Sequence, residues 1–263
     1  MRRILSAVAV GAILLGATEF ANAGTIAYLR SNEGQPWYQD SNEQAMNGVF
    51  SAGNWADLRY ETVNVDTLLS ATTSFIFMEG GDFTANMLEN FLTANRAVIE
   101  NWVSSGGRLF INSAPNEGDG MSLGFDGIHL NYNADNTYSS NNVTGTDPSH
   151  PIFTGPYGDT GYQFSGYYFS HATLYGAGLS GLIISDERSE MVLAEMNYGS
   201  GYVMFGGMTT LNFQSPNSLE LRENILSYAY SHDLNPVPEP ATMLIFGVGI
   251  FGLAAARRRM GRQ

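Results

Sequence analysis

An uncharged run of 16 residues, Ala241 to Ala256, lies near the C-terminus and is followed at once by Arg257, Arg258 and Arg259. An apolar run beside a cationic cluster is typical of a membrane segment with a cytoplasmic stop. As a helix the run reaches about 24 Å, less than a hydrocarbon core of about 30 Å, so its flanks must help it to span. The alternative is a core helix of the domain, which the missing polar face disfavours. We therefore expect a transmembrane segment at 241–256 and an Arg-rich cytoplasmic end at 257–263.

The beginning of the chain has the pattern of a secretory signal. Arg2 and Arg3 precede an apolar stretch from Ile4 to Ala17, and Ala21-Asn22-Ala23 forms a small-x-small cleavage site. This order predicts a signal peptide at residues 1–23, removed by signal peptidase. One secreted domain is then expected at 24–234, followed by an extended, proline-rich linker at 235–240.

Composition limits what this domain can do. The chain has no Cys, which excludes disulfides, thiolate metal sites and a cysteine nucleophile. It has no Lys, and the predicted domain holds six Arg against 23 acidic residues, a net charge of −17. So acidic a surface argues against nucleic acid or an anionic membrane as a partner and fits divalent cations or neutral glycans.

The residues before the apolar run form the motif Val237-Pro238-Glu239-Pro240. Motif, apolar segment and Arg cluster together resemble the PEP-CTERM sorting signal, whose tail is also called an ice-binding protein C-terminal domain without bearing on ice. The resemblance covers residues 236–263. It implies recognition of Pro238, Glu239 and Pro240 by an exosortase, a membrane protease that removes the tail. It also implies a Gram-negative, exopolysaccharide-making host. We expect export through the inner membrane, transient anchoring, and a final place at the cell surface or in the extracellular matrix.

Strand and helix patterns alternate in the first half of the domain. Strands are predicted at 25–29, 58–63, 74–78 and 108–112, and helices at 39–50 and 84–105, the second one stopped by Gly106 and Gly107. This order predicts right-handed crossovers and a parallel sheet. In the second half we expect a long loop at 116–146 with a short strand at 128–132. Further strands are expected at 167–169, 182–185, 191–196 and 202–205, and a closing helix at 218–231.

Four apolar and glycine-rich segments carry a second resemblance: Phe75–Gly81, Val103–Ile111, His150–Phe153 and Gly201–Gly207. They resemble the class I glutamine amidotransferase-like fold, in particular its non-catalytic, trehalose-utilisation-like members. The resemblance implies an α/β, flavodoxin-like, three-layer domain with a mostly parallel sheet. Catalytic members have a Cys after the strand that matches Leu109 to Ile111. Here Asn112, Ser113 and Ala114 follow it, so the thiol chemistry does not carry over.

Polar residues follow two of the predicted central strands. Because ligand-binding groups collect at the carboxyl ends of parallel strands, Glu79, Asp82, Asn112 and Ser113 are expected to line one crevice. The equally simple alternative is that Glu79 and Asp82 cap the following helix.

A serine hydrolase is a further possibility. Gly120-Met121-Ser122-Leu123-Gly124 matches the nucleophile-elbow pattern, and Asp147 or Asp159 with His171 follows in the order that a triad requires. The segment has a turn-rich loop before it and no helix after it, so a plain loop is the alternative. The chain's four His residues are at least 21 positions apart, which favours structural roles over metal binding.

Two clusters bear on ligands. Acidic residues in the loop suit Ca²⁺ but lack regular ligand spacing, so a solvated loop is the alternative; they are Glu117, Asp119, Asp126, Asp135 and Asp147. Aromatic residues crowd one stretch and suit either stacking on sugar rings or strand packing; they are Tyr157, Tyr162, Phe164, Tyr167, Tyr168, Phe169 and Tyr175. The sequence thus predicts a non-catalytic binding module for the envelope or exopolysaccharide. A glycan or ester hydrolase using Ser122 or Glu79, and a structural matrix component, are the alternatives.

Overall fold

The computed structural model describes residues 24–232. The predicted signal peptide, linker, membrane segment and Arg-rich end all lie outside these residues. Within 24–232, no helix is both long enough and apolar enough to cross a membrane.

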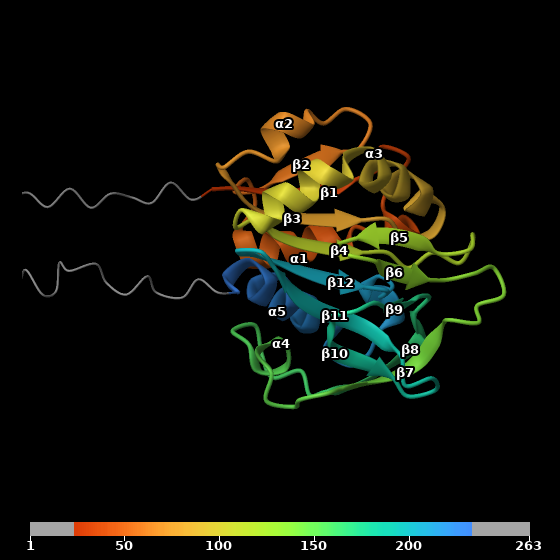
Figure 1. Ribbon diagram of the computed structural model, residues 1–263. Coiled ribbons are helices and arrows are strands. Elements are labelled where there is room, and N and C mark those ends of the chain that lie inside the picture. Colours follow the sequence, from red (N-terminus) through yellow and green to blue (C-terminus); the bar gives the residue numbers. More distant parts are fainter. Residues whose placement is uncertain (1–23, 233–263) are drawn as a thin grey trace, which may run out of the picture.

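The described chain forms twelve strands and a smaller number of helices (Figure 1). The strands are β1 (Thr25–Arg30), β2 (Ala56–Arg59), β3 (Thr73–Glu79), β4 (Arg108–Asn112), β5 (Met121–Gly124), β6 (Ile128–Asn131), β7 (Ser140–Gly145), β8 (Gln163–Ser170), β9 (Thr173–Tyr175), β10 (Ser180–Ser185), β11 (Met191–Tyr198) and β12 (Gly201–Gly206). The α-helices are α1 (Ser41–Phe50), α2 (Val65–Leu68), α3 (Ala85–Ser104), α4 (Pro151–Thr154) and α5 (Ser218–Ser231). Three short 3₁₀ helices are η1 (Pro36–Tyr38), η2 (Asp82–Thr84) and η3 (Leu211–Phe213).

One part of the sheet is parallel, as the alternation of strands and helices predicts. Strands β2, β1, β3, β4 and β12 lie side by side in this order and pair in parallel. Their carboxyl ends therefore meet at one edge, where Glu79 of β3 lies opposite Asn112 of β4. The elements that follow three of these strands, η1, η2 and η3, come after the same edge.

The rest of the sheet is antiparallel, and the predicted fold class is wrong. Strands β5 to β11 make only antiparallel pairs, so the sheet of the described residues is mixed rather than mostly parallel as in a flavodoxin-like or glutamine amidotransferase-like domain. The predicted loop from Asn116 to Thr146 contains the short strand predicted at 128–132, which is β6, and two strands that were not predicted, β5 and β7. The apolar residues of β5 and β7 are few and lie among Gly, Asn and Ser, so the sequence pattern of a strand is weak there.

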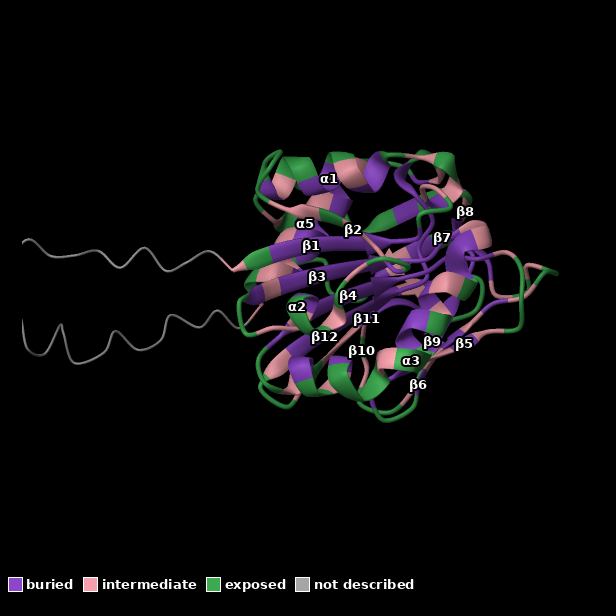
Figure 2. Ribbon diagram, turned by 90° about the horizontal axis from the view of Figure 1, so that it is seen from above, coloured by how far each residue is buried: buried purple, intermediate pink, exposed green. Residues whose placement is uncertain are grey.

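Two hydrophobic cores lie on opposite faces of the sheet (Figure 2). Because successive strand residues point to opposite faces, Ile76 and Met78 of β3 pack with α3, whereas Phe75 and Phe77 pack with α1 and α5. Helices α1 and α5 also contact each other. The central strands β3 and β4 are buried between these two cores, and so are the residues at their carboxyl ends, Glu79 and Asn112.

Candidate functional site

Glu79 and Asn112 are joined at the carboxyl edge of the parallel strands. Asn112 donates from Nδ2 to Glu79 Oε2 at 2.9 Å and to the carbonyl of Met208 at 2.8 Å, and its Oδ1 accepts from the Met208 amide at 3.1 Å. Both side chains are only 1% exposed. The pair therefore ties β3, β4 and the segment after β12 together in the interior, where solvent does not reach it.

A buried cation accompanies this carboxyl group. Arg222 of α5 is 1% exposed and donates from one terminal nitrogen to the carbonyl of Thr209 at 3.0 Å. Burial raises the pKa of Glu79 to about 8, against the opposing effects of the Arg222 charge and the Asn112 hydrogen bond. The Arg222 Nε and its other terminal nitrogen have no hydrogen-bond partner among the described residues. Glu79 and Arg222 thus form the centre of an interior polar cluster, in which burial favours the protonated form of the Glu79 carboxyl group.

The predicted crevice is only partly assembled. Ser113 is fully buried beside Glu79 and donates from Oγ to the carbonyl of Gly80, so its hydroxyl does not face solvent or a surface pocket. Asp82 lies in η2 with its backbone at φ 50° and lines a different, surface hollow. Burial, and secondarily the charge of Glu117, raises its pKa. The structure therefore brings Glu79, Asn112 and Ser113 together but leaves Asp82 apart from them.

Aromatic rings cover this edge on the outside. We call this surface the aromatic platform; it comprises Trp37, Tyr38, Phe83, Tyr167, Tyr168 and Phe213, with His171 below. Tyr38 and Tyr167 are each 76% exposed, and the rings of Trp37 and Tyr168 are half-buried. The elements that carry the rings, η1, η2, β8 and η3, are far apart in the sequence.

Ring contacts link the platform residues in two groups. Trp37 stacks on His171 with 4.8 Å between centroids, and Tyr168 lies 4.7 Å from the same imidazole. Tyr167 lies 4.8 Å from Tyr168. Trp37 also lies edge-on to Phe213 at 5.5 Å. Tyr38 and Phe83 form a separate pair, with 5.3 Å between their ring centroids.

Three of the platform residues have a left-handed backbone conformation. Trp37, Tyr38 and Tyr168 have φ of 54°, 56° and 58°, in the left-handed region that costs a residue with a side chain about 1–2 kcal/mol. Glycine permits the close packing around them. A Cβ on Gly166 of β8 would lie 1.8 Å from the carbonyl oxygen of Phe213, and one on Gly81 would lie 3.2 Å from the Trp37 ring. Such strain in several neighbouring residues is common where a protein holds a ligand.

Beside the platform lies an acidic hollow of about 220 Å³. Phe83 belongs to both, because its side chain also lines the hollow. The other lining residues are Asp82, Ala85, Asn86, Glu89, Glu117, Gly118, Asp119 and Tyr132. Hydrogen-bond acceptors therefore lie next to aromatic faces.

The aromatic stretch of the sequence divides between surface and core. Phe164 and Phe169 are buried, and Tyr157 donates its hydroxyl to the Val49 carbonyl at 3.3 Å. Tyr167 and Tyr168 belong to the platform, while Tyr162 and Tyr175 are exposed elsewhere. The sequence analysis did not identify the other platform residues as candidates for a binding site; they are Trp37, Tyr38, Phe83 and Phe213. The available signal was their position, since each follows a strand whose carboxyl end lies at the same edge.

The histidine that lies nearest to Ser122 in the strand register is His129 and not the predicted His171. In the β5–β6 pair Ser122 lies directly opposite His129, and both line a hollow of about 270 Å³ with Glu89 and Asp119. Arg96 donates to Ser122 Oγ at 3.1 Å, and His129 stacks on Tyr175. Within residues 24–232 no hydrogen bond joins Ser122 to His129. His171 instead bonds to Ser139 Oγ at 2.9 Å, so the predicted grouping of Ser122 with His171 is not formed.

The remaining predicted residues are dispersed. Asp147 accepts from the amide and hydroxyl of Ser149, and Asp159 accepts from the amide of Gly161. His150 accepts from the amide of Ile152 as the cap of α4. Among residues 24–232, no three His, Asp or Glu side chains are placed to hold a metal ion together.

Comparison with known proteins bears on the tail. Residues 236–259 match the family described as the PEP-CTERM protein-sorting motif. The chain carries an exosortase sorting signal. PEP-CTERM marks an exported, surface-directed protein that exosortase processes, and the match confirms the resemblance predicted from Val237 to Pro240. No curated protein matches the sequence.

Solved structures are similar to the described domain only distantly. The β-galactosidase from Bacillus circulans sp. alkalophilus is 9% identical with a TM-score of 0.48, and the match covers 79% of this chain and 30% of that one. The β-galactosidase from Rahnella sp. R3 is 13% identical with a TM-score of 0.45, and the match covers 78% of this chain and 30% of that one. The cytoplasmic protein STM1381 from Salmonella typhimurium LT2 is 14% identical with a TM-score of 0.42, and the match covers 79% of this chain and 95% of that one. The chain thus spans less than a third of either galactosidase. These comparisons do not confirm a glutamine amidotransferase-like fold.

Proposed function

We propose that this is an exosortase-sorted envelope or matrix protein whose domain binds an uncharged exopolysaccharide without catalysing a reaction. The observation that carries the proposal is the aromatic platform, where Tyr38 and Tyr167 are each 76% exposed. Aromatic faces with polar edges stack well on sugar rings, whose C–H groups are apolar and whose hydroxyls are not. The sorting signal supports a place outside the cell.

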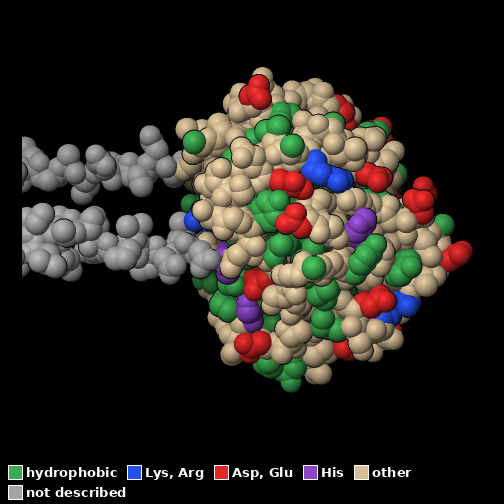
Figure 3. All heavy atoms as spheres, viewed as in Figure 1, with side chains coloured by type: hydrophobic (Ala, Val, Ile, Leu, Met, Phe, Trp, Pro, Cys, Tyr) green, Lys and Arg blue, Asp and Glu red, His purple; other side chains and the backbone are tan. Residues whose placement is uncertain are grey.

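The surroundings of the platform favour a neutral glycan over a charged one. The acidic hollow that shares Phe83 offers carboxylate and amide oxygens as acceptors for sugar hydroxyls. Acidic side chains are spread over the face in Figure 3, and basic ones are few. Negative charge on the protein repels an anionic polymer, so the account predicts weak binding to polyuronates and sulfated glycans.

Signal peptidase cleavage at residue 23 and transient anchoring by 241–256 remain part of the proposal. They agree with a chain that leaves the cytoplasm before exosortase removes the tail. A purely structural matrix role is the outcome if the domain binds no glycan.

A titration of the domain, residues 24–234, with the producing strain's neutral and anionic polysaccharides tests the proposal. Saturable binding to the neutral polymer, unchanged by Ca²⁺, is the expected result. If the domain shows no saturable binding to either polysaccharide, with or without Ca²⁺, the proposed function is wrong.

The second candidate, a hydrolase, is favoured by one observation: Ser122 and His129 lie opposite each other in the same hollow. Assays with model esters and β-glycosides, run on the intact domain and on Ser122→Ala and Glu79→Gln, test it. Turnover that both substitutions leave unchanged would exclude either residue as the source.

A further inference from the structure

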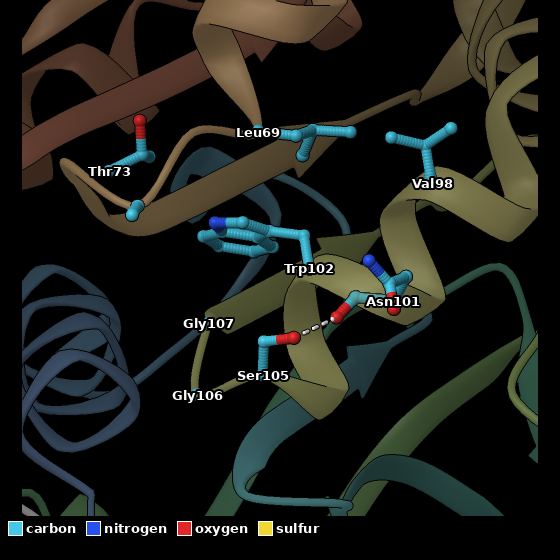
Figure 4. A pocket seen from close by; sticks show the side chains of 9 residues that line it. Leu69, Thr73, Val98, Asn101, Trp102, Ser105, Gly106 and Gly107 are labelled. Atoms are coloured by element: carbon cyan, nitrogen blue, oxygen red, sulfur yellow. Dashed lines mark hydrogen bonds between the residues drawn. The ribbon is translucent and has the colours of Figure 1, made fainter.

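A third hollow lies at the opposite, amino edge of the parallel strands (Figure 4). Its volume is about 350 Å³. The lining comes from the segment before β3, from the end of α3 and from the turn that follows; the residues are Leu69, Ala71, Thr73, Val98, Asn101, Trp102, Ser105, Gly106 and Gly107. None of them takes part in the aromatic platform or the interior polar cluster.

The shape of this amino-edge hollow is fixed by Trp102. The indole Nε1 donates to the Ser70 carbonyl at 3.3 Å, and the side chain is 7% exposed. A Cβ on Gly107 would lie 2.6 Å from the ring, so glycine is required for the ring to lie where it does. Val98, one turn before Trp102, is 47% exposed at the rim. The hollow is therefore preformed, with an apolar floor and a partly polar rim of Asn101 and Ser105.

Both ends of the described chain flank this hollow. At one end, the Thr25 amide donates to the Thr72 carbonyl at 2.7 Å, and Thr72 lies between two lining residues. At the other end, Arg108 Nε donates to the His232 carbonyl at 3.0 Å, and Arg108 follows the lining residue Gly107. The two ends of the described chain lie on the same side of the molecule (Figure 1).

The sorting motif lies only a few residues after His232, so an enzyme bound to the motif must lie near this hollow. Pro238 lies six positions after His232, which limits the distance between them to about 20 Å of extended chain. An enzyme that holds the motif is kept within that reach of the amino edge. A tether this short gives a second contact an effective concentration on the order of millimolar, so a weak apolar contact is enough to prolong the encounter.

We propose that the amino-edge hollow is a docking site for the exosortase that reads Pro238, Glu239 and Pro240. An apolar side chain on the extracytoplasmic surface of the enzyme lies against Trp102 between Val98 and Leu69. An anionic lipid surface is the less suitable occupant because the domain is itself strongly acidic. The docking site depends on the confirmed sorting motif and not on glycan binding, so the two proposals fail separately.

Processing of the full-length chain in cells with exosortase is the first test. Val98→Glu places a charge at the rim, whereas Thr93→Glu places one on an exposed position of the same helix outside the hollow. We expect conversion of the uncleaved to the cleaved form, followed by pulse labelling, to slow at least threefold for Val98→Glu alone. Both variants should keep the wild-type Tm, because both positions are exposed. Equal processing rates for the two variants would overturn the proposal.

Crosslinking identifies the occupant. A photoreactive benzophenone amino acid at position 98 of the full-length chain should give a covalent adduct with exosortase, recognised by its peptides in mass spectrometry. The same residue at position 93 should give much less. An adduct with lipid alone, or equal yields at both positions, would contradict docking of the enzyme at this hollow.

Discussion

The indole of Trp37 stacks on the imidazole of His171, with 4.8 Å between ring centroids and 15° between ring planes. Trp37 belongs to η1 after the first strand, whereas His171 lies between β8 and β9. The contact therefore joins the parallel and the antiparallel parts of the sheet at the surface where we propose that glycan binds. It fixes the ring that occupies the middle of the aromatic platform.

Acid should weaken this contact. Burial lowers the pKa of His171 from 6.5 to about 4, so the folded protein favours the neutral imidazole. A depressed folded pKa gives stability that is complete above pH 6.5 and is lost as the pH falls through 4. Compared with His171→Gln, the wild-type free energy of unfolding should decrease on the order of 2–3 kcal/mol over that range. Urea denaturation at several pH values measures this, and parallel pH curves for the two proteins would contradict it.

Glu79 should give the free energy of unfolding the opposite pH dependence, with stability lost as the pH rises. Burial raises its pKa from 4.5 to about 8, so the protonated form is favoured in the folded protein. Its contribution to stability is complete below pH 4.5 and is lost as the pH rises through 8. Glu79→Gln cannot ionise, and its free energy of unfolding should gain a few kcal/mol on the wild type between pH 5 and 8.5. A constant difference between the two proteins over this range would show that Glu79 is ionised in both states.

The sorting motif makes a prediction of its own. Replacement of Pro238, Glu239 and Pro240 by Ala should leave full-length protein in the inner membrane, because exosortase no longer recognises the tail. Fractionation and immunoblotting measure the size and location of the product. A chain of normal mature size in the exterior fraction would show that the motif is not read.

Local signals in the sequence were sufficient for several elements. The strand at Arg108–Asn112 and the helix at Ser218–Ser231 have the predicted bounds, and α3 ends within one residue of the predicted position because Gly106 and Gly107 stop it. The sheet as a whole was not predictable from these signals. Strands such as β5 and β7 are short and rich in small or polar residues, and β7 pairs with β10, which lies about 40 residues further along the chain.

The candidate site was predictable only in part. Glu79 and Asn112 were found because polar residues at strand ends stand out against apolar runs, but their burial depends on α5, which is far away in the chain. Trp37 and Tyr38 gave no periodic signal, since they lie in a three-residue 3₁₀ helix with left-handed backbone. Only the folded sheet brings them next to Tyr168 and His171.

The most direct test of glycan binding is a calorimetric titration of the neutral exopolysaccharide with four proteins: wild type, Tyr38→Ala, Tyr167→Ala and Tyr162→Ala. Tyr162 is the matched control, an exposed tyrosine of the same stretch that lies outside the platform. Loss of one stacking ring is worth about 0.5–1.5 kcal/mol, so Kd should rise roughly 2- to 12-fold for Tyr38→Ala and Tyr167→Ala and stay unchanged for Tyr162→Ala. Equal affinities for all four proteins would contradict the aromatic platform as the binding surface.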